Sequence, residues 1–156
     1  DLPEAVTAVN WSESQRERFG RAILASYEQT LDCPGLLGVR RIEDIIEGHM
    51  AAGKFRADLW TALYHGDEPV GVLLLNESAT RPALELVYLG LSVPWRGRGL
   101  ARRLMDHAIG EVAHQRMTSM LLAVDDRNVP ALRLYESLGF SAHSKKAAFI
   151  RSLRLQ

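Results

Sequence analysis

A long apolar segment that runs into a glycine-punctuated turn and then into an amphipathic helix constrains this chain of 156 residues more than any other feature. Apolar residues dominate Leu84–Val93, which predicts a strand long enough to be central in a sheet, and Pro94 ends it. From Leu100 to Val112 apolar residues recur at helical spacing, with charged residues off the stripe. The free N–H groups of the turn therefore lie at a helix N-terminus, where an anion can bind.

Shorter signals on either side of this unit alternate between helix and strand. Helices are predicted from Ser12 to Tyr27, opened by a capping box of Ser12 and Gln15, and from Ile42 to Gly53. Strands are predicted over four further segments, of which the last is expected to be buried: Ala5–Val9, Leu59–Tyr64, Val70–Leu75 and Met120–Val124. This mixture predicts one αβ domain over residues 1–156.

The last part of the chain holds a short helix between turn residues. Asn128 is predicted as its N-cap, Pro130 as a first-turn proline and Gly139 as its C-terminal cap. Two final segments, Phe140–His143 and Ala147–Leu155, favour a hairpin. The predicted order of elements is therefore β-α-α-β-β-β-α-β-α-β-β.

Charge and residue usage restrict the partners. Nineteen basic residues balance nineteen acidic ones, so there is no net positive field to attract nucleic acid or anionic lipid. The longest apolar run, Val70–Leu75, is too short to span a bilayer, and no signal-peptide pattern opens the chain. A lone Cys33 agrees with a reducing compartment, and the five histidines form no close metal-ligand pair. We expect a cytoplasmic protein without nucleic acid, membrane or metal partners.

The turn between the long strand and the strongest helix has residues suited to a diphosphate. Gly97 and Gly99 let the backbone approach a ligand closely and adopt positive φ without penalty. Arg96 and Arg98 add positive charge. The alternative is a plain strand-to-helix turn whose arginines are solvated.

Two segments in the right order resemble the GNAT (GCN5-related N-acetyltransferase) family. The turn matches the family's acetyl-CoA signature, Gln/Arg-x-x-Gly-x-Gly/Ala, at Arg96, Gly99 and Ala101. Downstream, the second motif is matched as Asn128-x-x-Ala131-x-x-Leu134-Tyr135-Glu136-x-x-Gly139-Phe140. The resemblance is specific from about Glu85 to Phe140 and looser in the first half of the chain.

Two other nucleotide-binding motifs fit less well. A Rossmann dinucleotide site requires a small residue where Arg102 stands, and the predicted hairpins before the turn do not build a doubly wound parallel sheet. Val70 to Ser78 contains no Gly-Lys-Ser/Thr element, which excludes a P-loop nucleotidase.

The resemblance implies a fold and a donor. The fold is the GNAT fold, a mixed αβ domain with a central twisted, mostly antiparallel sheet of about seven strands, splayed at its centre and flanked by about four helices. Acetyl-CoA would bind in the splayed cleft, and backbone groups near Leu91 and Val93 would polarise the thioester carbonyl. The implied acetyl-CoA contacts are Leu91, Ser92, Val93, Arg96, Gly97, Arg98, Gly99, Leu100, Ala101 and Asn128.

Two side chains are candidates for the chemistry. Tyr135 stands where the family places a tyrosine that donates a proton to the departing CoA thiolate, although Tyr135 also shares an apolar helix face with Leu132 and Leu138. Glu85 stands eleven positions before Arg96, where some relatives carry a catalytic glutamate, and would accept the proton of the acceptor ammonium. The alternative for Glu85 is a solvated glutamate, or one paired with Arg81.

The resemblance therefore implies an acetyltransferase that acts on a primary amine by direct attack in a ternary complex, without metal. A GNAT-fold module that only binds acyl-CoA as a regulator is the alternative. The acceptor, a small molecule or a peptide, stays unidentified, and a homodimer is allowed. The family selects its acceptor with segments that correspond here to Tyr27–Lys54 and Ala142–Phe149. Their acidic residues Glu28, Asp32, Glu43 and Asp44 suit a cationic amine, and a solvated helix surface explains them equally well.

Overall fold

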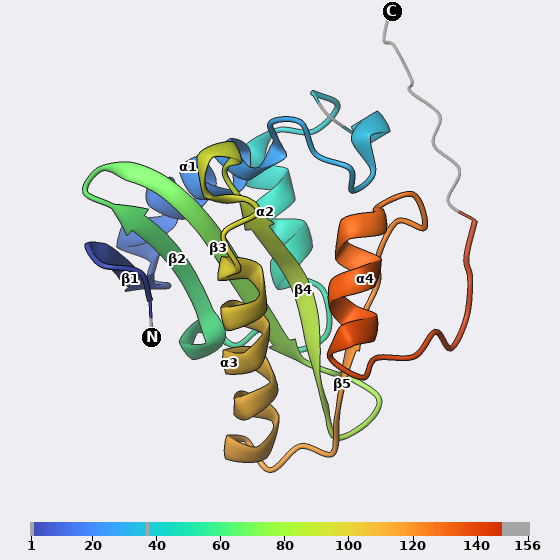
Figure 1. The fold of residues 1–156 in the computed structure, drawn as a ribbon. Helices are drawn as coiled ribbons and strands as arrows, with labels where there is room; N and C mark the ends of the chain where they lie inside the picture. Colours follow the sequence, from blue (N-terminus) through green and yellow to red (C-terminus); the bar gives the residue numbers. More distant parts are fainter. Residues whose placement is uncertain (1, 37, 148–156) are drawn as a thin grey trace, which may run out of the picture.

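The computed structural model describes residues 2–36 and 38–147 as a five-stranded sheet in the order β1-β2-β3-β4-β5, covered by four α-helices (Figure 1). The strands are β1 Val6–Asn10, β2 Trp60–His65, β3 Glu68–Glu77, β4 Ala83–Leu91 and β5 Ser119–Leu122. The helices are α1 Arg16–Tyr27, α2 Ile42–Met50, α3 Leu100–His114 and α4 Val129–Ser137. Across these ranges no helix has both the length and the apolar character needed to cross a membrane.

The pairing of β4 opens the sheet near its far edge. β1 to β4 pair antiparallel, whereas β5 pairs parallel with β4. This parallel ladder joins only Ala83–Leu86 to Ser119–Leu122. Among the described residues, no strand pairs with the second half of β4, residues 87–91, on its β5 side, so that backbone groups there need other partners.

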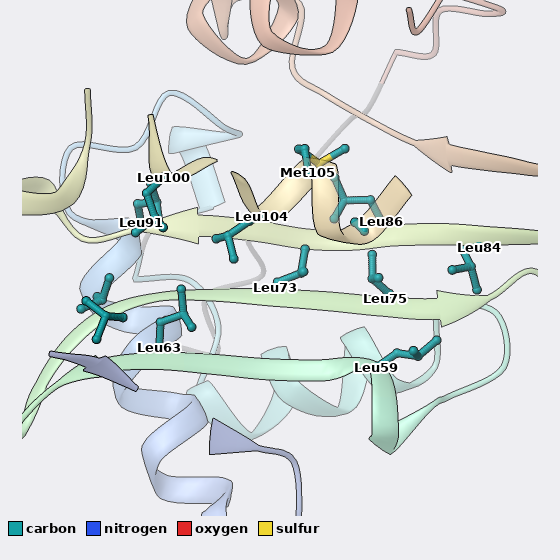
Figure 2. Close-up of a cluster of buried hydrophobic side chains, with 13 residues drawn as sticks. Leu59, Leu63, Leu73, Leu75, Leu84, Leu86, Leu91, Leu100, Leu104 and Met105 are labelled. Atoms are coloured by element: carbon teal, nitrogen blue, oxygen red, sulfur yellow. The ribbon is translucent and has the colours of Figure 1, made fainter. Parts of the chain in front are cut away.

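Two hydrophobic clusters, one on each face, hold the helices to the sheet. On one face α1 and α2 pack against Trp60, Tyr64 and neighbouring residues of β2 and β3. On the other face α3 inserts Leu100, Leu104 and Met105 against leucines of β2 to β4, as Figure 2 shows. Residues of α4 also pack against this second cluster. Burying each large apolar side chain contributes about 1.5–3 kcal/mol, so both faces of the sheet are firmly covered.

A buried asparagine joins the end of α2 to the sheet. The Asn76 side chain accepts a hydrogen bond from Trp60 Nε1 at 2.8 Å and donates to the carbonyls of His49 at 2.9 Å and Ala52 at 2.7 Å. Asn76 is fully buried. These bonds give the carbonyls at the end of α2 a side-chain donor, and they fix where α2 ends on the sheet.

Several details differ from the sequence predictions. The described residues form five strands rather than about seven, and Phe140–His143 is not a strand, because Phe140 closes the cap of α4 with its amide bonded to the Tyr135 carbonyl. Most of Ala147–Leu155 lies outside the described residues. The segment Met120–Val124 is half-buried at the sheet edge rather than fully buried. Ser12 forms no capping box, because the chain enters α1 through a 3₁₀ turn in which its carbonyl, not its hydroxyl, accepts from Gln15.

Candidate functional site

A cavity of about 200 Å³ lies beside the unpaired half of β4. Residues 88–91 of β4, residues 29–32 after α1 and the start of α4 at Asn128 and Pro130 line it, together with Ser26 and Arg96. A larger hollow of about 330 Å³ lies under the far end of α3, but none of the predicted site residues lines it. The smaller cavity is therefore the one that brings sequence-predicted residues together: Leu91, Arg96 and Asn128.

The β4 backbone presents polar groups to this cavity. The Ser92 amide bonds to the Val70 carbonyl at 3.0 Å, which fixes the alternation of the antiparallel ladder with β3. Residues 88 and 90 therefore bond to β3, and the backbone groups of Leu89 and Leu91 point the other way, where β5 has diverged. An extended ligand can pair with them as a strand would.

The turn before α3 leaves a run of amides without acceptors. Gly97 and Gly99 have φ of 71° and 75°, a left-handed conformation that penalises residues with a Cβ. Gly99 is the N-cap of α3. Among the described residues, the backbone N–H groups of residues 97–102 donate to no protein acceptor. Together with the positive end of the α3 dipole, these amides suit an anion.

Two predicted contact residues have other roles in the structure. The Arg96 guanidinium donates to the carbonyl of Leu91 at 2.9 Å and to three carbonyls at the end of α1, so it is turned away from the free amides. The Ser92 hydroxyl donates to the Pro69 carbonyl at 2.8 Å, and its amide is also bonded to β3. Both side chains are hydrogen-bonded within the protein itself, and Arg96 also lines the cavity. Arg98 is exposed, with its guanidinium 5.2 Å from the centre of the Trp95 ring.

The cap of α4 sets the position of Tyr135. The amide of Gly139, at φ 86°, bonds to the Glu136 carbonyl, and the Phe140 amide bonds back to the Tyr135 carbonyl, each at 3.0 Å. This pair of bonds is a Schellman motif. The rings of Phe140 and Tyr135 make the apolar contact that usually accompanies it, with their centroids 5.9 Å apart. The glycine cap predicted from the sequence is thus confirmed.

The Tyr135 hydroxyl is free to act as a donor. Burial, assisted by the negative charge of Asp32, raises the pKa of Tyr135 to about 12. The phenol therefore stays protonated at neutral pH. It makes no hydrogen bond to any other described residue.

Glu85 lies on the opposite face of the sheet from Tyr135. Its flanking leucines, Leu84 and Leu86, belong to the α3 cluster, whereas the Glu85 carboxylate points toward the end of α2, with Oε2 3.3 Å from where a Cβ on Gly53 would stand. Within the described ranges it makes no hydrogen bond or ion pair, and in particular none with Arg81. Glu85 and Tyr135 do not touch, and neither lines the cavity.

At the start of α4, Asn128 is the N-cap that the sequence predicts. Its Oδ1 accepts from the Ala131 amide at 3.3 Å, and Pro130 follows within the first turn. Because the residue also lines the cavity, its cap role leaves room for a ligand contact through the side-chain NH₂ group.

The sequence reasoning missed Tyr88 as a cavity residue. Its hydroxyl lies 2.8 Å from Ser26 Oγ. Its ring is stacked on that of His49, with the centroids 5.4 Å apart, and packs edge-on against the ring of Tyr27, with the centroids 5.7 Å apart. A β-bulge between β3 and β4 places both Val87 and Tyr88 on the α1/α2 face. A hydroxyl in an otherwise apolar strand was the available signal.

Comparisons with known proteins agree with this geometry. The model of the Acetyltransferase (GNAT) family matches residues 37–140. A mycothiol acetyltransferase from Acidothermus cellulolyticus is 37% identical over 76 residues, which are 49% of this chain and 19% of that protein. The chain spans only 19% to 25% of the first curated relatives that it matches.

Two solved structures have the same fold. A GNAT family acetyltransferase from Elizabethkingia anophelis with acetyl-CoA bound superposes with a TM-score of 0.65 at 12% identity, over 91% of this chain and 80% of that one. Arabidopsis thaliana Naa50, in complex with the bisubstrate analogue CoA-Ac-MVNAL, superposes with a TM-score of 0.63 at 22% identity, over 90% of this chain and 85% of that one. The predicted fold class is therefore confirmed.

Proposed function

This chain belongs to the GNAT acetyltransferase family, and from that premise we propose that it transfers the acetyl group of acetyl-CoA to a primary amine in a ternary complex. The observation that carries the proposal is the run of free amides at residues 97–102, placed next to the unpaired half of β4. One surface thus offers an anion site and a strand-like edge. Acetyl-CoA carries both matching parts, a diphosphate and an extended amide-containing arm.

The donor would lie along β4. The amides of residues 97–102 hold the diphosphate. The backbone groups of Leu89 and the amide of Leu91 pair with the pantetheine arm, since the Leu91 carbonyl accepts from Arg96. A donor amide there also stabilises the oxyanion that develops on the thioester carbonyl. Asn128 closes the cleft from the α4 side.

The reaction needs two proton transfers and one acyl transfer. Glu85 accepts a proton from the acceptor ammonium, directly or through water, and the neutral amine then attacks the thioester carbon. As the C–S bond breaks, its electron pair goes to sulfur, and the second proton passes from the nitrogen to the sulfur, directly or through water. Tyr135 donates a hydrogen bond to the thiolate, which stabilises the leaving group.

The pKa of Tyr135 decides which kind of donor it is. Full transfer from a phenol of pKa about 12 to a thiolate whose thiol has a pKa of about 8.5 is uphill by about 5 kcal/mol. A hydrogen bond to the developing thiolate requires no such transfer. The proton that CoA finally carries comes from the amine or from water.

The acceptor would approach from the α1/α2 face. There the Glu85 carboxylate has no partner among the described residues and lies near the C-terminal, electronegative end of α2, an environment that favours an ammonium group. The chain is similar both to a mycothiol acetyltransferase and to Naa50, which was solved with the bisubstrate analogue CoA-Ac-MVNAL. We propose a cationic primary amine as the acceptor class.

Calorimetry with acetyl-CoA tests the donor site. Gly99→Glu should lose at least about 10-fold in affinity, because the added carboxylate repels the diphosphate at the amides. Gly110→Glu places the same group in the middle of α3, where a Cβ meets nothing within 4 Å, and should bind like the wild type. Equal affinities of Gly99→Glu and wild type would refute the donor site.

A panel assay that measures CoA release tests the transfer. It would include polyamines, aminoglycosides, amino acids and lysine peptides, each with saturating acetyl-CoA. Turnover of any amine establishes the enzyme. Intact acetyl-CoA binding without turnover across the panel would instead support the acyl-CoA-binding regulatory module.

A further inference from the structure

Arg96 fastens the end of α1 to the end of β4. Its Nη2 donates to the carbonyls of Ser26 at 2.9 Å and Glu28 at 2.6 Å, and its Nη1 to that of Gln29 at 3.2 Å. Its Nε donates to the Leu91 carbonyl at 2.9 Å. These four bonds use four of the five N–H donors of the guanidinium.

The end of α1 needs such a donor because it has no glycine cap. The chain turns at Gln29, which takes a left-handed φ of 50°. Carbonyls at a helix end lack partners within the helix, and a cation there also meets the negative end of the dipole. Arg96 supplies both the hydrogen bonds and the charge from a position that is distant in the sequence.

The segment held by Arg96, residues 26–33, is named the lip here because it borders the cavity. Ser26 and residues 29–32 form part of the cavity lining. At its far end the Asp32 carboxylate accepts from the Asp125 amide at 3.3 Å, and the Cys33 amide donates to the Asp125 carboxylate at 3.2 Å. The lip is thus tied to β4 at one end and to the segment before α4 at the other.

We propose that Arg96 is a positioning residue that holds the lip over the cleft, and that it serves amine transfer rather than diphosphate binding. The inference rests on the proposed function only for its consequence on turnover. The diphosphate is left to the amides of residues 97–102 and to the exposed Arg98. Because Arg96 also binds the Ser26 carbonyl, it helps to keep Ser26 Oγ within hydrogen-bond distance of the Tyr88 hydroxyl.

Hydrogen exchange with mass spectrometry tests the hold on the lip without any ligand. In Arg96→Met and Arg96→Lys, amide exchange in residues 26–33 should rise about 10-fold or more, because a single ammonium cannot satisfy carbonyls on two elements. Exchange of the β3 amides at residues 70–75 should stay as in the wild type, which separates local loosening from global unfolding. Arg98→Met, which lacks contacts to the lip, is the control and should leave lip exchange unchanged.

Binding and turnover complete the test. Arg96→Lys should bind CoA within about threefold of the wild type in calorimetry, and Arg96→Met should do the same. With an amine that the panel identifies, kcat/KM for the amine at saturating acetyl-CoA should fall about 10-fold in both variants.

Two results would overturn the proposal. Unchanged lip exchange in Arg96→Met would show that the bonds do not hold the segment. A loss of CoA affinity in Arg96→Met that Arg96→Lys restores would identify Arg96 as a phosphate ligand, since a lysine keeps the charge. The exchange experiment reports on the lip even if no amine is acetylated, so failure of this proposal and failure of the proposed function are distinguishable.

Discussion

Acid should destabilise this protein through one half-buried imidazole, His49. Its ring is stacked on Tyr88 at an interplanar angle of 18°, and Nε2 is buried without a hydrogen-bond partner among the described residues. Burial, with a smaller contribution from the charge of Arg40, lowers the pKa of His49 from 6.5 to about 4. The folded protein therefore keeps His49 neutral, while the unfolded chain allows it to charge.

The sign and size of this change in the free energy of unfolding follow from proton linkage. Between pH about 6.5 and about 4 the unfolded chain binds more protons than the folded one, so stability is lost as the pH falls through this window. Above it, both states are neutral at His49 and the effect vanishes. From about pH 7.5 to about pH 5, the two pKa values give a loss of about 2 kcal/mol from this residue alone.

Urea unfolding at several pH values compares the wild type with His49→Phe. The phenyl ring keeps the stack on Tyr88 and removes the titration. Between these pH values the free energy of unfolding of the variant should therefore fall by about 2 kcal/mol less than that of the wild type. His107→Gln, an exposed change on α3, controls for loss of an imidazole. The same pH dependence in His49→Phe and wild type would refute the reasoning.

Three further substitutions test the site and its packing. Tyr135→Phe should reduce kcat by about 10²-fold where chemistry limits the rate, with unchanged CoA affinity; an unchanged kcat would leave Tyr135 a packing residue. Glu85→Gln should lower kcat and shift its rise with pH toward the amine's own pKa, about 10.4 for a lysine-type amine; wild-type rate and profile together would exclude Glu85 as the base. Gly90→Ala should destabilise by about 1–3 kcal/mol in urea unfolding, because its Cβ would lie 2.5 Å from Ser26 Oγ and 2.7 Å from the Tyr88 hydroxyl; full stability would show that α1 yields freely.

Local signals predicted the elements that local residues determine. The apolar stripe from Leu100, the N-cap at Asn128 and the glycine cap at Gly139 are confirmed, because each depends on neighbours within one or two turns. The motif that contains them also led to the correct family.

Contacts between distant residues decided what the sequence did not show. The carbonyls that hold Arg96 at the end of α1 lie 67 to 70 positions away, so the arginine looked like a phosphate ligand. The bulge in β4 breaks the alternation of side chains between the two faces of the sheet, and no residue type in that strand indicates where the register shifts. For that reason the strand prediction, which is correct for Tyr88, did not place its side chain at the wall of the cleft.

The place of β1 in the sheet has a consequence for how the chain folds. β2, β3 and β4 follow one another as hairpins, with His65 paired to Glu68 only three positions later. β1 instead pairs across 51 to 59 positions, from Asn10 with Thr61 to Val6 with His65. Closing the longer loop costs roughly 2–3 kcal/mol more in chain entropy than closing the hairpin. We therefore expect the three-stranded meander to form first and β1 to join late, so that the folding rate of the whole domain depends on how soon its first ten residues find an edge assembled from residues far along the chain.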